Sequence, residues 1–342
     1  MANYYLSKNY NSITSAGNKA KTDNEKIMSD MGFKSAGLKQ TTCKNKVTGF
    51  ILTLAGILKM IFKVSANDTV VIQYPYKKYY TLACNMIHRK KGKVITIVHD
   101  LGSFRRKKLS PEQEIRRLSH SDCLIVHNNN MKNWLLEHNY SKQIVIQWIW
   151  DYLSDTENNI ERILKNKPII VTYAGSLSYR KNRFIYDLNN VISSWQFELY
   201  GSGFETDKIQ YPDKFLFRGY CPSNQLIETA CGHFGLLWDG DSTIGCTGNF
   251  GEYLQFNNPH KASLYVRCHL PIITWEKAAM STFILQNRIG ICVNSLEELD
   301  TVLPSISVDE YEEMTHNIKE ISKNVASGYY LKQALNLAFP LK

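Results

Sequence analysis

The chain has 342 residues, of which 44% are hydrophobic and 21% charged, which is typical of a soluble globular protein long enough for two domains. Its 41 basic and 31 acidic residues leave a net charge of +10, which favours acidic partners: nucleic acid, anionic lipid or phosphate-bearing substrates. Nucleic acid is not expected, because no binding module is recognisable and the basic runs are not interleaved with stacking aromatics.

Eight cysteines are scattered without a CxxC pair, and several lie inside apolar runs. This pattern favours reduced core thiols in a cytoplasmic protein over disulfides or a zinc site. The first residues lack the charged-then-apolar pattern of a secretion signal. The longest apolar run, 50–62, contains Lys59 and is too short to span a bilayer, so we expect a buried or an interfacial helix there.

The first half of the chain alternates short apolar runs with helical patterns. The expected strands lie at residues 4–6, 69–73, 94–98, 123–126 and 144–150. The expected helices lie at 18–31, 50–62 and 79–88, with one more that begins at 111 and another that follows the strand 123–126 and ends near 138. Ser110, Pro111 and Glu112 are typical of a helix start, as N-cap, first residue and acid in the first turn. Such alternation predicts the α/β class, with a mostly parallel sheet covered on both faces.

A polar segment at 151–167 is the expected linker, and a second alternating set follows it. Its expected strands lie at 168–173, 197–200, 215–217 and 290–293, with further apolar runs beginning at 234 and 270. From 308 onward the chain is expected to be helical, with a break at 328–330. We therefore expect one domain at 1–152, a second at 168–314 and C-terminal helices at 315–342. One alternative for these helices is that they cross back and pack on the first domain.

The stretch 234–275 reads as one β–loop–α–β unit and carries the strongest functional signal. Asn258 is expected to cap its helix, with Pro259 as first residue and His260 and Lys261 in the first turn. Ligands of open parallel sheets bind beyond the carboxyl ends of the strands, and the amides of a helix N-terminus attract anions. Since cations there oppose the helix dipole, the pattern predicts a phosphate site. The alternative is a solvated lysine and a structural histidine.

Other segments of the second half are expected at the same sheet edge. Arg180 and Lys261 can neutralise a diphosphate, and Gly201 lets the backbone approach a ligand, although an ordinary turn explains that glycine equally well. Tyr220 can stack on a base, with a partly buried structural tyrosine as the alternative. Asp239 and Asp241 match the Asp-x-Asp metal motif of some sugar transferases, but so short a match is common by chance.

Several segments of the second half resemble those of a known family, and they are 238–240, 251–254, 257–261, 263–265 and 270–275. Looser matches in the first half are 16–20, Asp23, Gly32 and 97–100. They resemble bacterial GT-B glycosyltransferases, in particular β-1,6-galactofuranosyltransferases and the glucosyltransferase that extends serine-rich adhesins. The resemblance implies two Rossmann-like parallel-sheet domains facing across a cleft. The C-terminal domain would hold the nucleotide sugar, and the N-terminal domain the acceptor.

The resemblance also implies roles for individual residues. Those on the donor side are Arg180, Gly201, Tyr220, Asp239, Glu252, Asn258, His260 and Lys261, and those on the acceptor side are Gly17 and Lys19. Arg180 and Lys261 would hold the diphosphate, and Asp239 or Glu252 a sugar hydroxyl. No metal and no cofactor is implied, since cationic side chains and a helix N-terminus act on the leaving group of the UDP-sugar co-substrate. The hexose is galactofuranose, galactose or glucose.

The β-linkage of the similar enzymes implies inversion, which requires a general base for the acceptor hydroxyl. Asp100 is the first candidate, because it ends an apolar strand at the carboxyl edge of the acceptor domain. The alternative is a loop residue that accepts hydrogen bonds from the amides of Gly102 and Ser103. His99 or Glu252 would then inherit the role.

Two functions from different classes remain open: a sugar transferase in surface polysaccharide or glycoprotein glycan synthesis, and a non-catalytic nucleotide- or glycan-binding protein with the same fold. The acceptor is a glycan, with a lipid-linked one as an alternative. That alternative would bring the basic runs 88–93 and 105–108 and the 50–62 helix to the inner face of the membrane. A second copy of the chain is a further partner to test.

Overall fold

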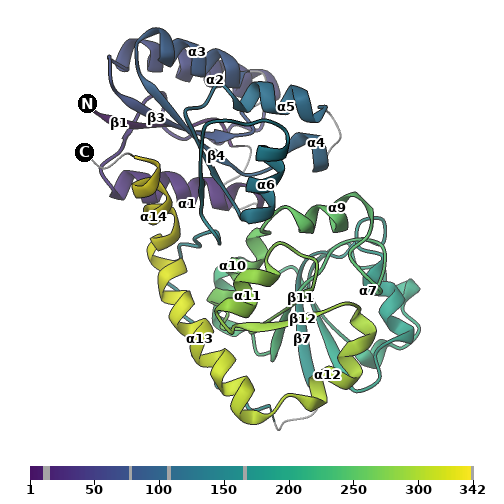
Figure 1. Cartoon of the computed structure of the whole chain (residues 1–342). Helices are drawn as coiled ribbons and strands as arrows, with labels where there is room; N and C mark the ends of the chain where they lie inside the picture. The colour runs from purple at the N-terminus through teal and green to yellow at the C-terminus, as the bar shows by residue number, and fades with distance from the viewer. Residues whose placement is uncertain (11–15, 77–78, 106–108, 165–167, 340–342) are drawn as a thin grey trace. The chain divides into compact units, whose positions relative to one another are not determined.

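The computed structural model describes residues 1–10, 16–76, 79–105, 109–164 and 168–339. The chain divides into two units, Met1–Tyr152 with Gly328–Lys342, and Leu153–Ser327, each built on one six-stranded sheet with helices on both sides (Figure 1). Every strand pair in both sheets is parallel, so the predicted α/β class is confirmed. The boundary expected at 315 falls inside helix α13 (Val308–Ser327), and the chain joins the first unit again at Gly328.

The sheet of the first unit has its strands in the order β2 (Lys34–Ser35), β1 (Asn3–Leu6), β3 (Thr69–Tyr74), β4 (Lys93–Val98), β5 (Cys123–Val126), β6 (Gln143–Ile146). The strand expected at 144–150 is too long, because Trp148 has a φ of 72°, in the left-handed region that ends an extended strand. Since all strands are parallel, their carboxyl ends meet at one edge.

The helices of the first unit are α1 (Ala16–Asp30), α2 (Lys46–Lys63), α3 (Tyr80–Arg89), α4 (Gly102–Arg105), α5 (Pro111–Leu118), α6 (Asn129–Glu137) and α14 (Tyr329–Ala338). α5 begins as predicted, with a capping box between Ser110 and Gln113. α14 packs on α1, β5 and β6. The Asp151 carboxylate accepts the amide hydrogens of Tyr330 and Leu331 and so caps its first turn.

Helix α2 is not the buried helix that one alternative predicted. Its inner side buries Gly49, Gly56, Ile57 and Met60, while apolar side chains on its other side are exposed to solvent. Among the described residues no helix is long and apolar enough to cross a membrane.

The sheet of the second unit has the order β12 (Gly290–Val293), β11 (Ile272–Trp275), β10 (Phe234–Leu237), β7 (Ile169–Ser176), β8 (Trp195–Ser202), β9 (Phe215–Gly219). Its helices are α7 (Phe184–Asp187), α8 (Ser223–Thr229), α9 (Gly248–Glu252), α10 (His260–Arg267), α11 (Ser281–Gln286), α12 (Leu299–Ser305) and α13. In its core, Tyr173 of β7 packs against Phe197 of β8, and Phe234 of β10 packs against Tyr311 of α13.

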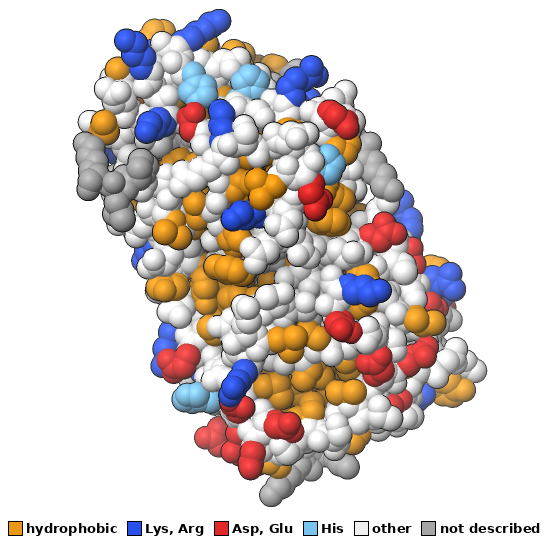
Figure 2. Space-filling model, in the orientation of Figure 1, with side chains coloured by type: hydrophobic (Ala, Val, Ile, Leu, Met, Phe, Trp, Pro, Cys, Tyr) orange, Lys and Arg blue, Asp and Glu red, His pale blue; other side chains and the backbone are white. Residues whose placement is uncertain are grey.

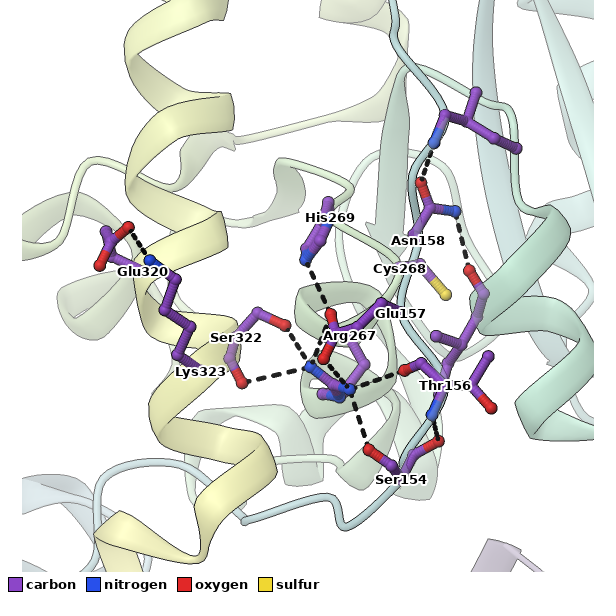
Figure 3. A network of polar contacts seen from close by, with 12 residues as sticks. Ser154, Thr156, Glu157, Asn158, Arg267, Cys268, His269, Glu320, Ser322 and Lys323 are labelled. Atoms are coloured by element: carbon purple, nitrogen blue, oxygen red, sulfur yellow. Dashed lines mark hydrogen bonds and ion pairs between the residues drawn. The ribbon is translucent and has the colours of Figure 1, made fainter.

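Much of the expected linker packs on the second unit. The guanidinium group of Arg267, at the end of α10, is fully buried and donates to the carbonyls of Ser154 (3.1 Å) and Thr156 (2.7 Å). It also pairs with the Glu157 carboxylate at 2.9 Å and donates to the Ser322 hydroxyl of α13 at 2.7 Å (Figure 3). One side chain therefore ties together α10, α13 and the segment 154–157.

Candidate functional site

The centre of the candidate donor site lies where β7, β10 and α10 meet. The Lys261 ammonium in the first turn of α10 lies 3.0 Å from Asp239 Oδ1, just beyond the end of β10. It also donates to the Tyr173 hydroxyl of β7 at 3.1 Å and to the Trp238 carbonyl at 3.4 Å. The Tyr173 hydroxyl donates in turn to Asp239 Oδ1 at 3.1 Å. Lys261, Asp239 and Tyr173 form one hydrogen-bonded group, called the Lys261 cluster below.

Asn182 holds this cluster in place from the turn after β7. Its side-chain amide donates to the Tyr173 hydroxyl at 3.0 Å and to the Ser176 carbonyl at 2.7 Å. Its carbonyl oxygen accepts the amide hydrogen of Gly240 at 3.3 Å, which fixes the turn that follows Asp239. Burial, and then the Asp239 charge, raise the pKa of Tyr173 well above its ordinary value of 10, so its hydroxyl keeps its proton.

The side chains of Lys261 and Asp239 are each 16% exposed, so the ion pair is mostly buried and still open to a ligand on one side. An anion arriving at the N-terminus of α10 would meet the amides of that helix and an ammonium group already neutralised by Asp239. For an anion to bind here, the Lys261 ammonium must contact the anion as well as the Asp239 carboxylate, or the Asp239 carboxylate must turn toward another partner. A sugar hydroxyl is such a partner, since a carboxylate can accept its hydrogen bond.

Helix α10 begins one residue later than the sequence predicted. Its N-cap is Pro259, with φ of −65° and ψ of 137°, and its first residue is His260. The prediction of Asn258 as cap is wrong because the backbone of Pro259 is still extended. Asn258 is 3% exposed and lies before the helix as a buried residue.

The other predicted donor residues are not part of the Lys261 cluster. Arg180 is exposed in the turn after β7, and Glu252 is exposed at the end of α9. Tyr220, beyond β9, is 71% exposed, so the partly buried structural tyrosine is the wrong alternative. Gly201 has a φ of 151°, and a Cβ there would collide with the carbonyl oxygen of Gly175. The pairing of β7 with β8 is thus sufficient to explain that glycine.

The candidate acceptor site in the first unit lies at the carboxyl ends of β3 to β6. The His99 ring stacks on Trp150, with ring centroids 4.5 Å apart and planes 4° apart, and His127 meets Trp150 edge-on at 4.7 Å. His99 Nε2 lies 2.7 Å from Gln73 Oε1. Burial lowers the pKa of His127 to about 3, so this histidine is neutral.

Asp100 follows His99 and is half-buried. The loop alternative assigned it the amide hydrogens of Gly102 and Ser103. Those amides donate instead to the carboxylate of Glu114, both at 2.7 Å. The loop alternative is therefore wrong, because the buried carboxylate of Glu114 in α5, and not that of Asp100, accepts these two amide hydrogens.

Gly17 and Lys19, the predicted acceptor-side residues, lie in the first turn of α1. Gly17 is exposed, and a Cβ built there would meet no described atom within 4 Å. Lys19 forms an ion pair with Asp23 at 2.8 Å and lies over the Tyr152 ring at 4.5 Å.

Comparison with known proteins supplies the family. Two family models match, the N-terminal domain of glucosyltransferase 3-like proteins over residues 3–149 and their C-terminal domain over residues 171–338. The β-1,6-galactofuranosyltransferase WbbI of Escherichia coli strain K12 is 32% identical over 336 residues, which cover 97% of either chain. The chain belongs to the glucosyltransferase 3-like family.

Other relatives of this glucosyltransferase 3-like chain agree. Glucosyltransferase 3 of Streptococcus gordonii is 24% identical over 283 residues, which are 80% of this chain and 79% of that protein. The solved structure of WaaG, a glycosyltransferase involved in lipopolysaccharide biosynthesis, is similar with a TM-score of 0.53 at 8% identity, covering 99% of this chain and 100% of WaaG. The predicted GT-B fold is confirmed, and so is the predicted function at its coarse level, glycosyl transfer.

Sequence reasoning missed Tyr173 of the Lys261 cluster in this family member, and also Asn182, which holds the cluster in place. Tyr173 stands in an apolar run and reads as a core aromatic, and Asn182 reads as a turn residue. The available signal was position, because Tyr173 lies in the last half of β7 and Asn182 in the turn segment that follows this strand.

The Asp-x-Asp reading finds little support in this geometry. Asp239 is engaged by an ammonium and a hydroxyl group, and Asp241 points at the turn around Gly248. Across the described parts of the chain, no three His, Cys, Asp or Glu side chains gather as metal ligands would.

Proposed function

We propose that this glycosyltransferase moves a hexose from a UDP-sugar to a hydroxyl group of a glycan acceptor, with inversion and without a metal ion. The observation that carries the proposal is the Lys261 cluster at the N-terminus of α10, where an ammonium group and helix amides offer positive charge to a diphosphate. The functions printed for WbbI and glucosyltransferase 3 support sugar transfer as the reaction.

In this proposal the donor binds the second unit through three kinds of contact. Lys261 neutralises the diphosphate, and Arg180 in the exposed turn after β7 contributes a second cation. Asp239 turns from Lys261 to a sugar hydroxyl, with Glu252 as the other candidate. The exposed ring of Tyr220 stacks on the base. His260 and Asn258 border the helix start on which the diphosphate rests.

We take galactofuranose as the first donor to test, because the 32% identical relative is a galactofuranosyltransferase. Glucose is the second, from the name of the more distant relative. The acceptor is a glycan bound by the first unit, where Gly17 leaves space for it and Lys19 lies nearby.

Asp100 is the proposed general base, and His99 is the alternative. Gln73 Nε2 donates to the Lys21 carbonyl at 3.0 Å, so Gln73 Oε1 acts as acceptor and His99 Nε2 carries the proton between them. A neutral His99 then has its lone pair on Nδ1, the atom that would take a proton.

The proposed location is the cytoplasm, at the inner face of the membrane when the acceptor is lipid-linked. All eight cysteines are present as thiols, which fits a reducing compartment.

The test is a thermal-shift screen of nucleotide sugars followed by product analysis for each one that binds. We expect UDP-galactofuranose or another UDP-hexose to raise the melting temperature and to be hydrolysed or transferred, with EDTA leaving the rate unchanged. Binding without turnover, under all acceptors tried, would favour the non-catalytic binding protein. A strict requirement for Mn²⁺ would return Asp239 and Asp241 to the role of metal ligands.

A further inference from the structure

Helix α2 in the first unit is apolar on both of its sides. Its inner side buries Gly49, Gly56, Ile57 and Met60. Its outer side carries a stripe of large apolar side chains spaced by whole helical turns, and these are Val47, Ile51, Leu58 and Phe62, exposed by 69%, 58%, 50% and 85%. A helix of this kind is buried in a core or lies against an apolar medium, and α2 is not buried in this chain.

The charge around this stripe has one sign. From Met31 to His99 the sequence holds twelve lysines and arginines and a single acid, Asp68, so this stretch alone exceeds the net charge of +10 of the whole chain. Asp68 is 5% exposed and its carboxylate is occupied by the amides of Ala2 and Ser65. The lysines on or near α2 are exposed, and they are Lys34, Lys39, Lys44, Lys46, Lys59 and Lys63. Figure 2 shows the same bias, with blue side chains over the end of the first unit that holds α2 and α3.

From these observations we propose that the outer side of α2 is a docking surface for an anionic lipid bilayer. Val47, Ile51, Leu58 and Phe62 enter the boundary between headgroups and acyl chains. Lys46 and Lys59 extend their ammonium groups to the lipid phosphates. The inference deepens the proposed location at the inner face of the membrane by naming the helix that docks, and its test needs neither donor nor acceptor.

The charge pattern decides between this occupant and the others that an apolar stripe could take. A second copy of the chain docked through α2 would bring two sets of exposed lysines together with no acid between them, which is repulsive. Nucleic acid would satisfy the lysines and leave the apolar stripe in water. An anionic bilayer is complementary to both features, and the six lysines make the attraction depend on salt.

The experiment is co-sedimentation of the full chain with vesicles, at low and at high salt. The vesicles contain phosphatidylcholine alone or a mixture of phosphatidylcholine and phosphatidylglycerol. We expect binding to the mixed vesicles at low salt and much weaker binding to pure phosphatidylcholine. The double substitution Ile51→Ser/Phe62→Ser removes two side chains that would be buried in lipid, so it should lower binding about tenfold or more at either salt concentration.

The variant Lys46→Gln/Lys59→Gln should lower binding about tenfold at low salt and make little difference at high salt. The matched control is Leu136→Ser/Leu285→Ser, which removes two other exposed apolar side chains, 48% and 54% exposed, from α6 and α11. It should bind vesicles as the unmodified chain does, and equal melting temperatures establish that every variant is folded.

Three results would overturn the proposal. The first is equal sedimentation with neutral and anionic vesicles at low salt. The second is unchanged vesicle binding in Ile51→Ser/Phe62→Ser. The third is a combination of two observations. The unmodified chain forms a dimer in analytical ultracentrifugation and does not bind the vesicles, and Ile51→Ser/Phe62→Ser is a monomer. That result would identify a second copy of the chain as the occupant.

Discussion

The Lys261 ammonium contacts three protein oxygens, those of Asp239, Tyr173 and Trp238. If a diphosphate takes one of these places, Lys261→Ala should weaken UDP binding about 10- to 100-fold, the range for hydrogen bonds to a charged group. Calorimetric titration of UDP measures it. Lys277→Ala, an exposed lysine of the same unit, is the matched control and should leave UDP affinity unchanged. Equal affinities in the two variants would remove Lys261 from the site.

Asp100→Asn keeps the size of the side chain and removes its basicity. Turnover should fall about 100-fold or more, the usual loss of a general base, while UDP affinity and melting temperature stay the same. His99→Gln is the companion variant, since it removes the lone pair on Nδ1. Near-normal turnover in Asp100→Asn together with an inactive, folded His99→Gln would assign the base to His99.

Two buried carboxyl groups give the first unit a pH dependence. Burial raises the pKa of Glu25 from 4.5 to about 7, against the hydrogen bonds it accepts from Tyr10 and Ser7, and burial also raises the pKa of Asp151 to about 7. Below pH 4.5 the Glu25 carboxyl is neutral in the folded and the unfolded chain. Between pH 4.5 and 7 the unfolded chain releases the proton first, so the free energy of unfolding falls as pH rises, and above pH 7 the full cost is present.

The Glu25 share of this loss is on the order of 3 kcal/mol. Urea unfolding of the first unit between pH 5 and pH 8 should therefore show decreasing stability. Glu25→Gln should flatten the curve, because an amide does not titrate. The slope that remains should combine Asp151, which acts in the same direction, with His127, whose lowered pKa makes stability rise with pH up to about 6.5. An unchanged slope in Glu25→Gln would mean that the carboxyl is not neutral in the folded protein.

At the scale of elements, the Arg267 guanidinium joins α10, α13 and the segment 154–157. Arg267→Ala leaves buried carbonyl and hydroxyl groups without a donor, so we expect the second unit to lose about 3 kcal/mol of stability in urea unfolding. Arg288→Ala is the matched control, since Arg288 also pairs with α13, through Glu313, but on the surface. It should leave stability unchanged within error. Comparable losses in the two variants would contradict the role assigned to Arg267.

The order of elements was predictable from the sequence, and the partners of polar side chains were not. Short continuous apolar runs and the cap at Ser110 located strands and helices to within a few residues. Glu114 reads as a solvated acid of a helix, yet it is fully buried and accepts the amides of the loop after β4. From the sequence alone, Tyr173 likewise looks like an ordinary core residue and Arg267 like an ordinary surface residue. Their roles depend on which strands become neighbours, and no local pattern contains that information.

At the scale of the molecule, the two units have separate hydrophobic cores, and the chain passes between them at Tyr152 and at Gly328. A helix break is expected at 328–330 from the sequence, whereas the boundary expected at 315 falls inside α13, which is helical across that point. The position is explained by Gly328 itself, whose φ of 77° suits a residue between two helices and is strained for other side chains. A Cβ there would also press on the Ile27 side chain of α1.

This division predicts two unfolding transitions in calorimetry, each with its own sensitivity. UDP at about 100 times its Kd should raise the melting temperature of the second unit only, which corresponds to about 2.7 kcal/mol of stability, because a ligand stabilises the unit that binds it.

A chain shortened to end at Ser327 loses the buried Leu331, Ala334 and Leu335 of α14 and leaves the Asp151 carboxylate without the two amides that donate to it. That change should lower only the transition of the first unit. A single transition that UDP and the shortening both shift would show that the two units unfold as one.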